Sequence, residues 1–122
     1  MKTSNDPRHL QRIKVMQELF AWNFKKNSAP GSETGKKIVS NLAQIDLLIQ
    51  SSAPSWPLDK INRVDLAILR LAVYELMLDK KNPLKVIIDE AVELAKEFGG
   101  ESSPSFINGA LGKLITDNQI MV

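Results

Sequence analysis

The stretch that decides the fold is NRVDLAILRLAVYELML, residues Asn62–Leu78. Between Ala67 and Leu78 only Arg70 and Glu75 are not apolar, so the segment is hydrophobic on nearly every side when it coils as a helix. Such a helix must run through the middle of a bundle, because it needs apolar partners in several directions. It is too short and too often interrupted by charge to span a bilayer, which takes about 20 predominantly apolar residues. We expect Arg70 and Glu75 to reach the edge of the bundle and to form pairs there.

Length and composition indicate one globular domain, which we place at residues 1–122. The chain is 43% hydrophobic and 25% charged, as is usual for such a domain. It has no cysteine, which excludes disulfides, thiolate chemistry and cysteine-based zinc sites. The N-terminal MKTSNDPRHLQ has no apolar run, and we do not expect it to be a signal peptide. We therefore expect a cytoplasmic protein that needs no metal, no cofactor and no membrane.

Positive charge is concentrated toward the N-terminus. Residues 1–37 hold eight Lys or Arg against three Asp or Glu, a net charge of +5, so the remaining residues carry −3 of the total of +2. A basic arm on a slightly acidic body suggests a polyanion at one end and a basic protein partner at the other. A simply solvated face explains the same charges, and the sequence leaves both interpretations open.

Apolar residues recur at helical spacing along the chain and predict an all-α, compact antiparallel bundle of about five to six helices. An N-cap residue followed by proline marks helix starts at Asp6, Asn82 and Ser103. Besides the central helix, the expected helical segments are 6–26, 36–50, a turn at 56–61, 82–98 and 103–115. Residues 1–6 are expected to be a flexible end, and the Pro/Gly/Ser-rich stretch 27–35 to be a loop.

Two arginines one turn apart, Arg8 and Arg12, should project from the same face of the first helix, where they can contact an anion or be solvated. His9 is the one histidine, and we expect it on the surface near a frayed helix end. At the start of the central helix, Asn62 is the expected N-cap. Asp65 is three residues further on, in a capping-box position, which gives it a structural role besides any functional one.

Two glycines, Gly109 and Gly112, lie inside the last predicted helix, where each costs up to ~1 kcal/mol relative to alanine. Glycine is favoured where another backbone or a ligand such as RNA approaches the helix closely, because it has no side chain. We expect close packing against a second helix.

Motifs of catalysis are lacking in the sequence. GSETGK, residues 31–36, has three residues between its glycines instead of the four of a phosphate-binding loop, and no Ser or Thr follows its lysine. Neither a G-x-S-x-G nor an H-E-x-x-H motif occurs. The acidic pairs Asp89/Glu93 and Glu93/Glu97 are expected on an exposed helix face, which solvation explains. We expect no enzymatic activity.

The C-terminal sequence PLKVIIDEAVELAKEFGGESSPSFINGALGKL strongly resembles the C-terminal signature of the NusB transcription antitermination family. VDLAILRLAVYEL resembles the central helix of that family, and RHLQRIKVMQELFAWNF is similar to its N-terminal helix. The resemblance covers residues 8–26 and 36–117. It implies a NusB-like helical bundle in two antiparallel halves.

The function implied by this resemblance is binding of the boxA element of nascent ribosomal RNA, without catalysis. The implied protein partner is NusE, a small-subunit ribosomal protein, with which NusB helps RNA polymerase to read through terminators. Other Nus factors and RNA polymerase would then be indirect partners. Some members of the family are thought to form a homodimer that hides the RNA face.

The resemblance also assigns site residues. In the RNA-binding set, the basic start of the first helix and the last helix with its preceding loop supply Lys2, Arg8, Arg12, Ser102, Phe106 and Asn108. In the partner-binding set, the matching positions are Phe20, Asp59 and Asp65, whose carboxylates suit a basic ribosomal protein. Phe106 could equally belong to the core.

Two departures from the family pattern are evident. The arginine cluster of the first helix is sparser, which predicts weaker and less salt-dependent RNA binding. The segment between the first and second helices is shorter, and one helix should be missing. Two other functions remain open: an RNA-binding module of a ribosomal RNA cytosine methyltransferase, for which no cofactor-binding Gly-rich segment is present, and a helical adaptor that binds only protein.

Overall fold

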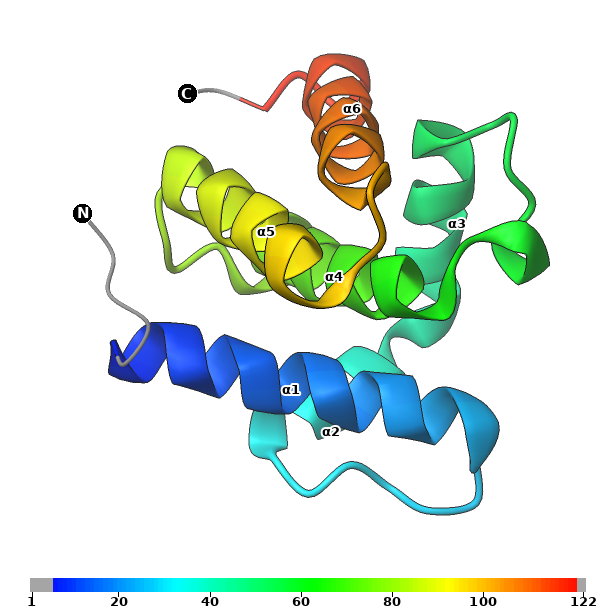
Figure 1. Cartoon of the computed structure of the whole chain (residues 1–122), viewed down its shortest axis with the longest axis vertical. Coiled ribbons are helices and arrows are strands. Elements are labelled where there is room, and N and C mark those ends of the chain that lie inside the picture. Colours follow the sequence, from blue (N-terminus) through cyan, green and yellow to red (C-terminus); the bar gives the residue numbers. More distant parts are fainter. Residues whose placement is uncertain (1–5, 121–122) are drawn as a thin grey trace.

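The computed structural model describes residues 6–120, in which the chain forms six α-helices and no β-strand (Figure 1). The helices are α1 (Pro7–Phe24), α2 (Glu33–Ser40), α3 (Leu42–Ser52), α4 (Arg63–Tyr74), α5 (Leu84–Phe98) and α6 (Ser103–Asp117). A 3₁₀ turn, η1 (Leu58–Lys60), precedes α4, and a π-helical turn, η2 (Glu75–Asp79), extends it. The expected all-α bundle is confirmed.

The helix α4 forms the centre of the bundle. Every residue from Asp65 to Tyr74 is buried. The helix contacts α1, α2, α3, α5 and α6, and in Figure 1 it crosses the middle of the molecule with α1 below it and α6 above it. A helix that is apolar on all sides is stable only in such a place, because each face meets a neighbour. None of the described helices is long and apolar enough to cross a bilayer.

The segment predicted as one helix over 36–50 is two helices, which corrects the expectation. α2 ends at Ser40 and α3 begins at Leu42, with Asn41 between them. The side-chain amide of Asn41 donates to the carbonyl of Lys37 at 2.8 Å, and such local bonds compete with the helical ladder. The apolar period conceals the break, because Ile38 and Ile45, seven residues apart, are both fully buried.

The predicted loop 27–35 is shorter than expected, because α2 begins at Glu33. Ser32 caps this helix by accepting a hydrogen bond from the backbone N–H of Gly35 at 3.0 Å. Glu18 of α1 in turn accepts hydrogen bonds from the backbone and the hydroxyl of Ser32. The loop is therefore fastened to α1 at its end.

The two polar interruptions of the central helix do pair, but inside the bundle and not at its edge. Arg70 is 5% exposed and donates to both carboxylate oxygens of Asp46 at 3.0 Å, and to the side chain of Asn23 at 3.1 Å. Glu75 is 7% exposed and pairs with Arg12. Burial of an arginine in this way requires a carboxylate partner with matched geometry.

The N-terminus of α4 is capped as expected by Asn62, whose side-chain oxygen accepts from the backbone N–H groups of Val64 at 2.8 Å and Asp65 at 3.3 Å. The expected capping box is wrong. The Asp65 side chain does not bond back to Asn62, and one of its oxygens, Oδ1, has no hydrogen-bond partner in the described structure. The carboxylate is thus not used by the cap.

Candidate functional site

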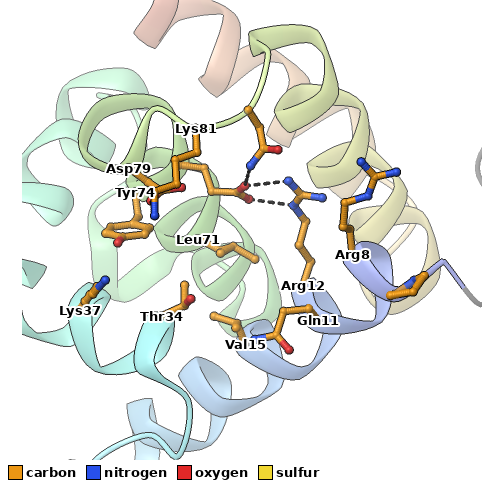
Figure 2. Close-up of a pocket in the computed structure, with 13 residues that line it drawn as sticks. Arg8, Gln11, Arg12, Val15, Thr34, Lys37, Leu71, Tyr74, Asp79 and Lys81 are labelled. Atoms are coloured by element: carbon orange, nitrogen blue, oxygen red, sulfur yellow. Dashed lines mark hydrogen bonds and ion pairs between the residues drawn. The ribbon is translucent and has the colours of Figure 1, made fainter.

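The two arginines at the start of α1 have different surroundings. The Arg8 side chain is 81% exposed, and its only ion pair within the described residues is with Asp6, at 3.5 Å. The Arg12 guanidinium instead donates to both carboxylate oxygens of Glu75, at 2.9 and 2.7 Å (Figure 2). It also lies 3.6 Å from Glu90. The hydrogen bonds to Glu75 raise the pKa of Arg12. The expectation of an exposed pair is therefore wrong for Arg12, and its contact with RNA stays a prediction.

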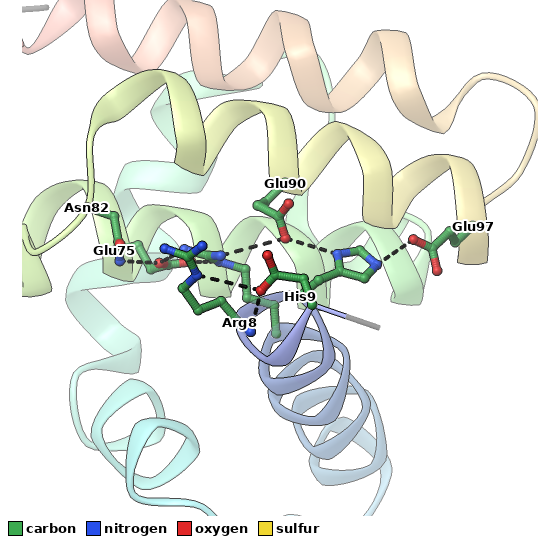
Figure 3. Close-up of polar contacts among 8 residues, drawn as sticks. Arg8, His9, Glu75, Asn82, Glu90 and Glu97 are labelled. Atoms are coloured by element: carbon green, nitrogen blue, oxygen red, sulfur yellow. Dashed lines mark hydrogen bonds and ion pairs between the residues drawn. The ribbon is translucent and has the colours of Figure 1, made fainter. Parts of the chain in front are cut away.

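His9 is buried, which corrects the expectation of a surface side chain. It is 4% exposed, with its ring nitrogens 3.0 Å from Glu90 and 2.6 Å from Glu97, both on α5 (Figure 3). The hydrogen bond to Glu90 raises the pKa of His9 most, that to Glu97 adds to it, and burial opposes both. Together with Arg12, the ring fastens the first two turns of α1 to α5.

The sequence contains one signal for this contact. Glu90 and Glu97 are seven residues apart, and His9 and Arg12 are three apart, so each pair occupies one helix face. Spacing alone does not show that the two faces meet, because the pairs are separated by more than seventy residues. This is why Glu97 was expected to face only water.

A hollow with both aromatic and polar walls lies where the first turn of α4 meets α6. We call it the Trp56–Phe106 pocket, and its volume is about 480 Å³. It is lined by Trp56, Lys60, Asp65, Ser102, Ser105 and Phe106, among others. The two aromatic rings meet edge to face, with centroids 6.2 Å apart and planes at 75°. Trp56 is 51% exposed, so its ring is open to a ligand.

Asp65 lines this pocket with an unused acceptor. The residue is 5% exposed, and its Oδ1 has no hydrogen-bond partner within residues 6–120. Burial raises the pKa of Asp65, and a hydrogen bond from Ser103 partly offsets this. A buried carboxylate oxygen without a partner is costly, and a ligand that donates an N–H or O–H group would remove that cost. A partner-binding role on an exposed surface does not fit this burial.

Beyond the pocket, α6 presents an exposed face. Ser102 and Asn108 are exposed, as expected of contact residues, while Phe106 is half-buried and is both core and pocket wall. The expectation of close packing at the glycines is wrong. A Cβ added at Gly109 or at Gly112 would meet no atom within 4 Å. The alternative, that a ligand approaches the exposed backbone, stays open.

The other partner-binding positions lie on separate elements. Phe20 of α1 is partly buried and stacks edge to face with Phe24, with ring centroids 5.1 Å apart. Phe24 is itself 62% exposed, so the pair presents apolar surface. Asp59 of η1 is exposed and has no ion pair in the described part of the chain. Lys2 lies outside the described residues.

These features define a class of protein: an all-α bundle built around one buried helix, with an aromatic pocket over a buried carboxylate and a basic, half-neutralised start to its first helix. A family model described as the NusB family matches residues 32–116. The chain belongs to the NusB family.

Individual relatives agree with this assignment. "Transcription antitermination protein NusB" of Chloroflexus aggregans is 42% identical over 95 residues, which is 73% of this chain and 63% of that protein. The protein of the same name from Acetivibrio thermocellus is 50% identical over 80 residues, 66% of this chain and 55% of its own length. The chain thus spans less than two-thirds of the length of each of these relatives. They are named as antitermination proteins and not as enzymes.

Solved structures match over nearly the whole chain. T. maritima NusB has a TM-score of 0.80 and 34% identity, covering 96% of this chain and 94% of that one. A structure titled "Crystal Structure of a Plectonemic RNA Supercoil" also has a TM-score of 0.80, covering 94% of this chain and 98% of that one. Its identity is 20%, so it supports the fold alone.

Proposed function

We propose that this chain is a transcription antitermination factor that binds single-stranded RNA of the boxA type. The observation that carries the proposal is the Trp56–Phe106 pocket with the unpaired Asp65 oxygen beneath it. Proteins that read single-stranded RNA stack splayed bases on aromatic side chains and hydrogen-bond their edges. The pocket combines an open aromatic ring with an acceptor that lacks a donor.

The base edge that suits Asp65 is one that donates. A carboxylate can accept from the amino and imino groups of guanine, or from the amino groups of cytosine and adenine. We therefore move Asp65 from the protein-binding set to the RNA-binding set. Ser102 and Asn108 are exposed and are proposed to contact phosphates and sugars beside the pocket, and the exposed Arg8 is proposed to contact an RNA phosphate at the start of α1.

The protein partner is proposed to be NusE, bound by the Phe20–Phe24 pair and by Asp59. The apolar surface of Phe24 on α1 and the exposed carboxylate of Asp59 on η1 each suit a protein partner, and the carboxylate suits one that is basic overall, as ribosomal proteins are. Other Nus factors and RNA polymerase would then be reached through the RNA–protein complex and not by direct contact. A homodimer of the free protein would compete with this complex, and light scattering with and without RNA detects it.

A binding assay tests the RNA site. Fluorescence anisotropy with labelled boxA-like RNA is measured with and without NusE, for the wild type, Trp56→Ala and Phe24→Ala. Loss of a base–aromatic stack should weaken binding about fivefold or more for Trp56→Ala. Phe24→Ala removes an aromatic ring of similar exposure away from the pocket and should leave binding by the free protein unchanged.

Two results would reject the assignment. If both variants bind RNA as the wild type does, the pocket does not hold a base. If the wild type associates with NusE in a salt-insensitive way and shifts no RNA, the chain is an adaptor that binds only protein. Asp65→Asn gives a further readout, because an amide oxygen and nitrogen replace two acceptors and the preferred base at one position of the RNA should change.

A further inference from the structure

The one histidine of the chain, His9, makes contacts that only its charged form can complete. Its Nδ1 lies 3.0 Å from Oε1 of Glu90, and its Nε2 lies 2.6 Å from Oε1 of Glu97 (Figure 3). A neutral imidazole donates from one ring nitrogen and presents a lone pair on the other, whereas an imidazolium donates from both. Because each nitrogen faces a carboxylate, the observed arrangement requires the imidazolium.

The surroundings of the His9 ring are acidic, and they are open to solvent protons. The charged groups that contact the ring, lie near it on the same helix face, or pair with a group beside it come from α5, from α1 with its N-cap, and from η2. They are Asp89, Glu90, Glu93, Glu97, Asp6, Arg8, Arg12 and Glu75. Carboxylates outnumber guanidinium groups, so this environment favours the protonated ring. The ring is 4% exposed but borders a hollow of about 260 Å³, through which water can reach it.

The two carboxylates in contact with His9 differ in their freedom to move. The Glu90 side chain is 4% exposed and also lies 3.6 Å from Arg12, so it is held in place. The Glu97 side chain is 40% exposed and can turn into water. A neutral His9 keeps its donor toward Glu90 and turns a lone pair toward Glu97, and two acceptors repel each other. Loss of the proton therefore breaks the contact with Glu97.

We propose that His9 and Glu97 form a proton-controlled latch between the first turn of α1 and the last turn of α5. When His9 is protonated the latch is closed. When His9 loses its proton, Glu97 is released and the two helix ends separate locally. The rest of α1 stays in place, because Arg12 remains bonded to Glu75 and Leu19 remains buried in the core.

The test is hydrogen exchange measured by NMR on the whole chain without RNA. His9 gives the one histidine ring signal, and its titration midpoint should lie above 6.5. The readout is the amide protection factor, which corrects for the intrinsic pH dependence of exchange. As the pH rises through the midpoint, protection at Leu10 and Gly99 should fall relative to Leu69 of α4 by at least about threefold, the change expected for one hydrogen bond. Both amides are hydrogen-bonded at their helix ends, so their exchange reports local opening.

Two substitutions of His9 fix the closed and open forms. His9→Arg carries a permanent cation that can donate to both carboxylates, and it should keep protection high at every pH. His9→Gln carries no charge and should keep protection low at every pH. At the other side of the latch, Glu97→Gln should lower the titration midpoint of His9. Glu101→Gln removes the same charge from an exposed residue four positions further along, and should shift the midpoint much less.

Three results would overturn the latch. The first is unchanged relative protection at Leu10 and Gly99 across the midpoint. The second is an equal fall at Leu69, which would mean that the proton acts on the whole fold and not on the two helix ends. The third is an equal midpoint shift for Glu97→Gln and Glu101→Gln.

The wild type and His9→Arg decide the question even if His9→Gln does not fold, because only the wild type should lose protection as the pH rises. None of these measurements involves RNA. Their failure therefore leaves the proposed function unaffected, and failure of Trp56→Ala to weaken RNA binding leaves the latch unaffected.

Discussion

The charged side chains at the start of α1 follow one another along one helix but have opposite surroundings. Arg8 lies in solvent, His9 between two carboxylates, and Arg12 on a third. A buried ion pair adds little compared with an apolar pair, but removing one member leaves an uncompensated charge. At the residue scale, the buried groups are therefore expected to act on stability and the exposed one on binding.

The first residue-scale prediction concerns the pair of Arg12 and Glu75. Arg12→Met should lower the free energy of unfolding by about 3 kcal/mol or more, because it strands a buried carboxylate. The double variant Arg12→Met/Glu75→Met should recover a large part of that loss. Urea denaturation of the two single variants and the double variant completes the cycle. Strictly additive losses would show that the two side chains do not stabilise each other.

The second residue-scale prediction concerns pH. The pKa of His9 is raised above its ordinary value of 6.5, so folding favours the protonated ring. Its contribution to stability is complete below the unfolded pKa and is lost as the pH rises through the raised folded value. The urea midpoint should therefore be highest at a pH below the unfolded value of 6.5 and should decrease as the pH rises above it.

His9→Gln provides the control for this pH dependence. Glutamine can donate one hydrogen bond to Glu90 or Glu97 but carries no titrating charge. The variant should be less stable than the wild type at acidic pH, where His9 is protonated. Its urea midpoint should decrease much less than that of the wild type as the pH rises. If the decline persists unchanged in His9→Gln, another group is responsible for it.

At the scale of elements, apolar spacing predicted where the chain is helical, because each helix must bury one stripe. It could not predict the break at Asn41, since the period continues across it from Ile38 to Ile45. Nor could it assign the carboxylates of α5, because the partners of His9 lie 81 and 88 residues away in sequence. Such contacts depend on how helices pack, which no local pattern contains.

The candidate site residues also differ in how well their surroundings could be predicted from the sequence. The exposed positions Ser102 and Asn108 were placed on the surface by sequence similarity, and the structure agrees on their exposure. No local pattern indicates that Trp56 faces Phe106, since the two rings are fifty residues apart and connect a loop to α6. The burial of Asp65 was likewise hidden, because a first-turn acidic residue is usually a solvated partner of the helix N-terminus.

The glycines of α6 give a prediction for an element. Gly112→Ala should raise the free energy of unfolding by about 0.5–1 kcal/mol, because the exposed helix gains propensity and the new methyl group meets no atom within 4 Å. Gly99→Ala is the matched substitution at the end of α5, where the methyl group would lie 2.8 Å from the carbonyl oxygen of Ala95. It should be destabilising. Thermal denaturation of both variants measures the contrast, and a destabilised Gly112→Ala would show that this face is covered.

On the scale of the whole molecule, the charge distribution predicts how RNA binding depends on salt. The chain carries only +2 overall, so a general attraction to RNA is weak, and the positive charge of residues 1–37 must act locally. The basic start of α1 is further reduced, because Arg12 is neutralised by Glu75. Affinity should therefore fall only gently with salt compared with a protein that makes many phosphate contacts.

The last prediction separates local contact from overall charge. If Arg8 contacts an RNA phosphate, Arg8→Gln should reduce the slope of log affinity against log salt concentration by about 0.7, the change expected for one contact with a single strand. Lys25→Gln makes the same change in net charge at the opposite end of α1 and should leave the slope nearly unaltered. Anisotropy titrations over a series of salt concentrations measure both slopes. Equal reductions in the two variants would mean that RNA senses the net charge of the molecule and not the side chain at the start of α1.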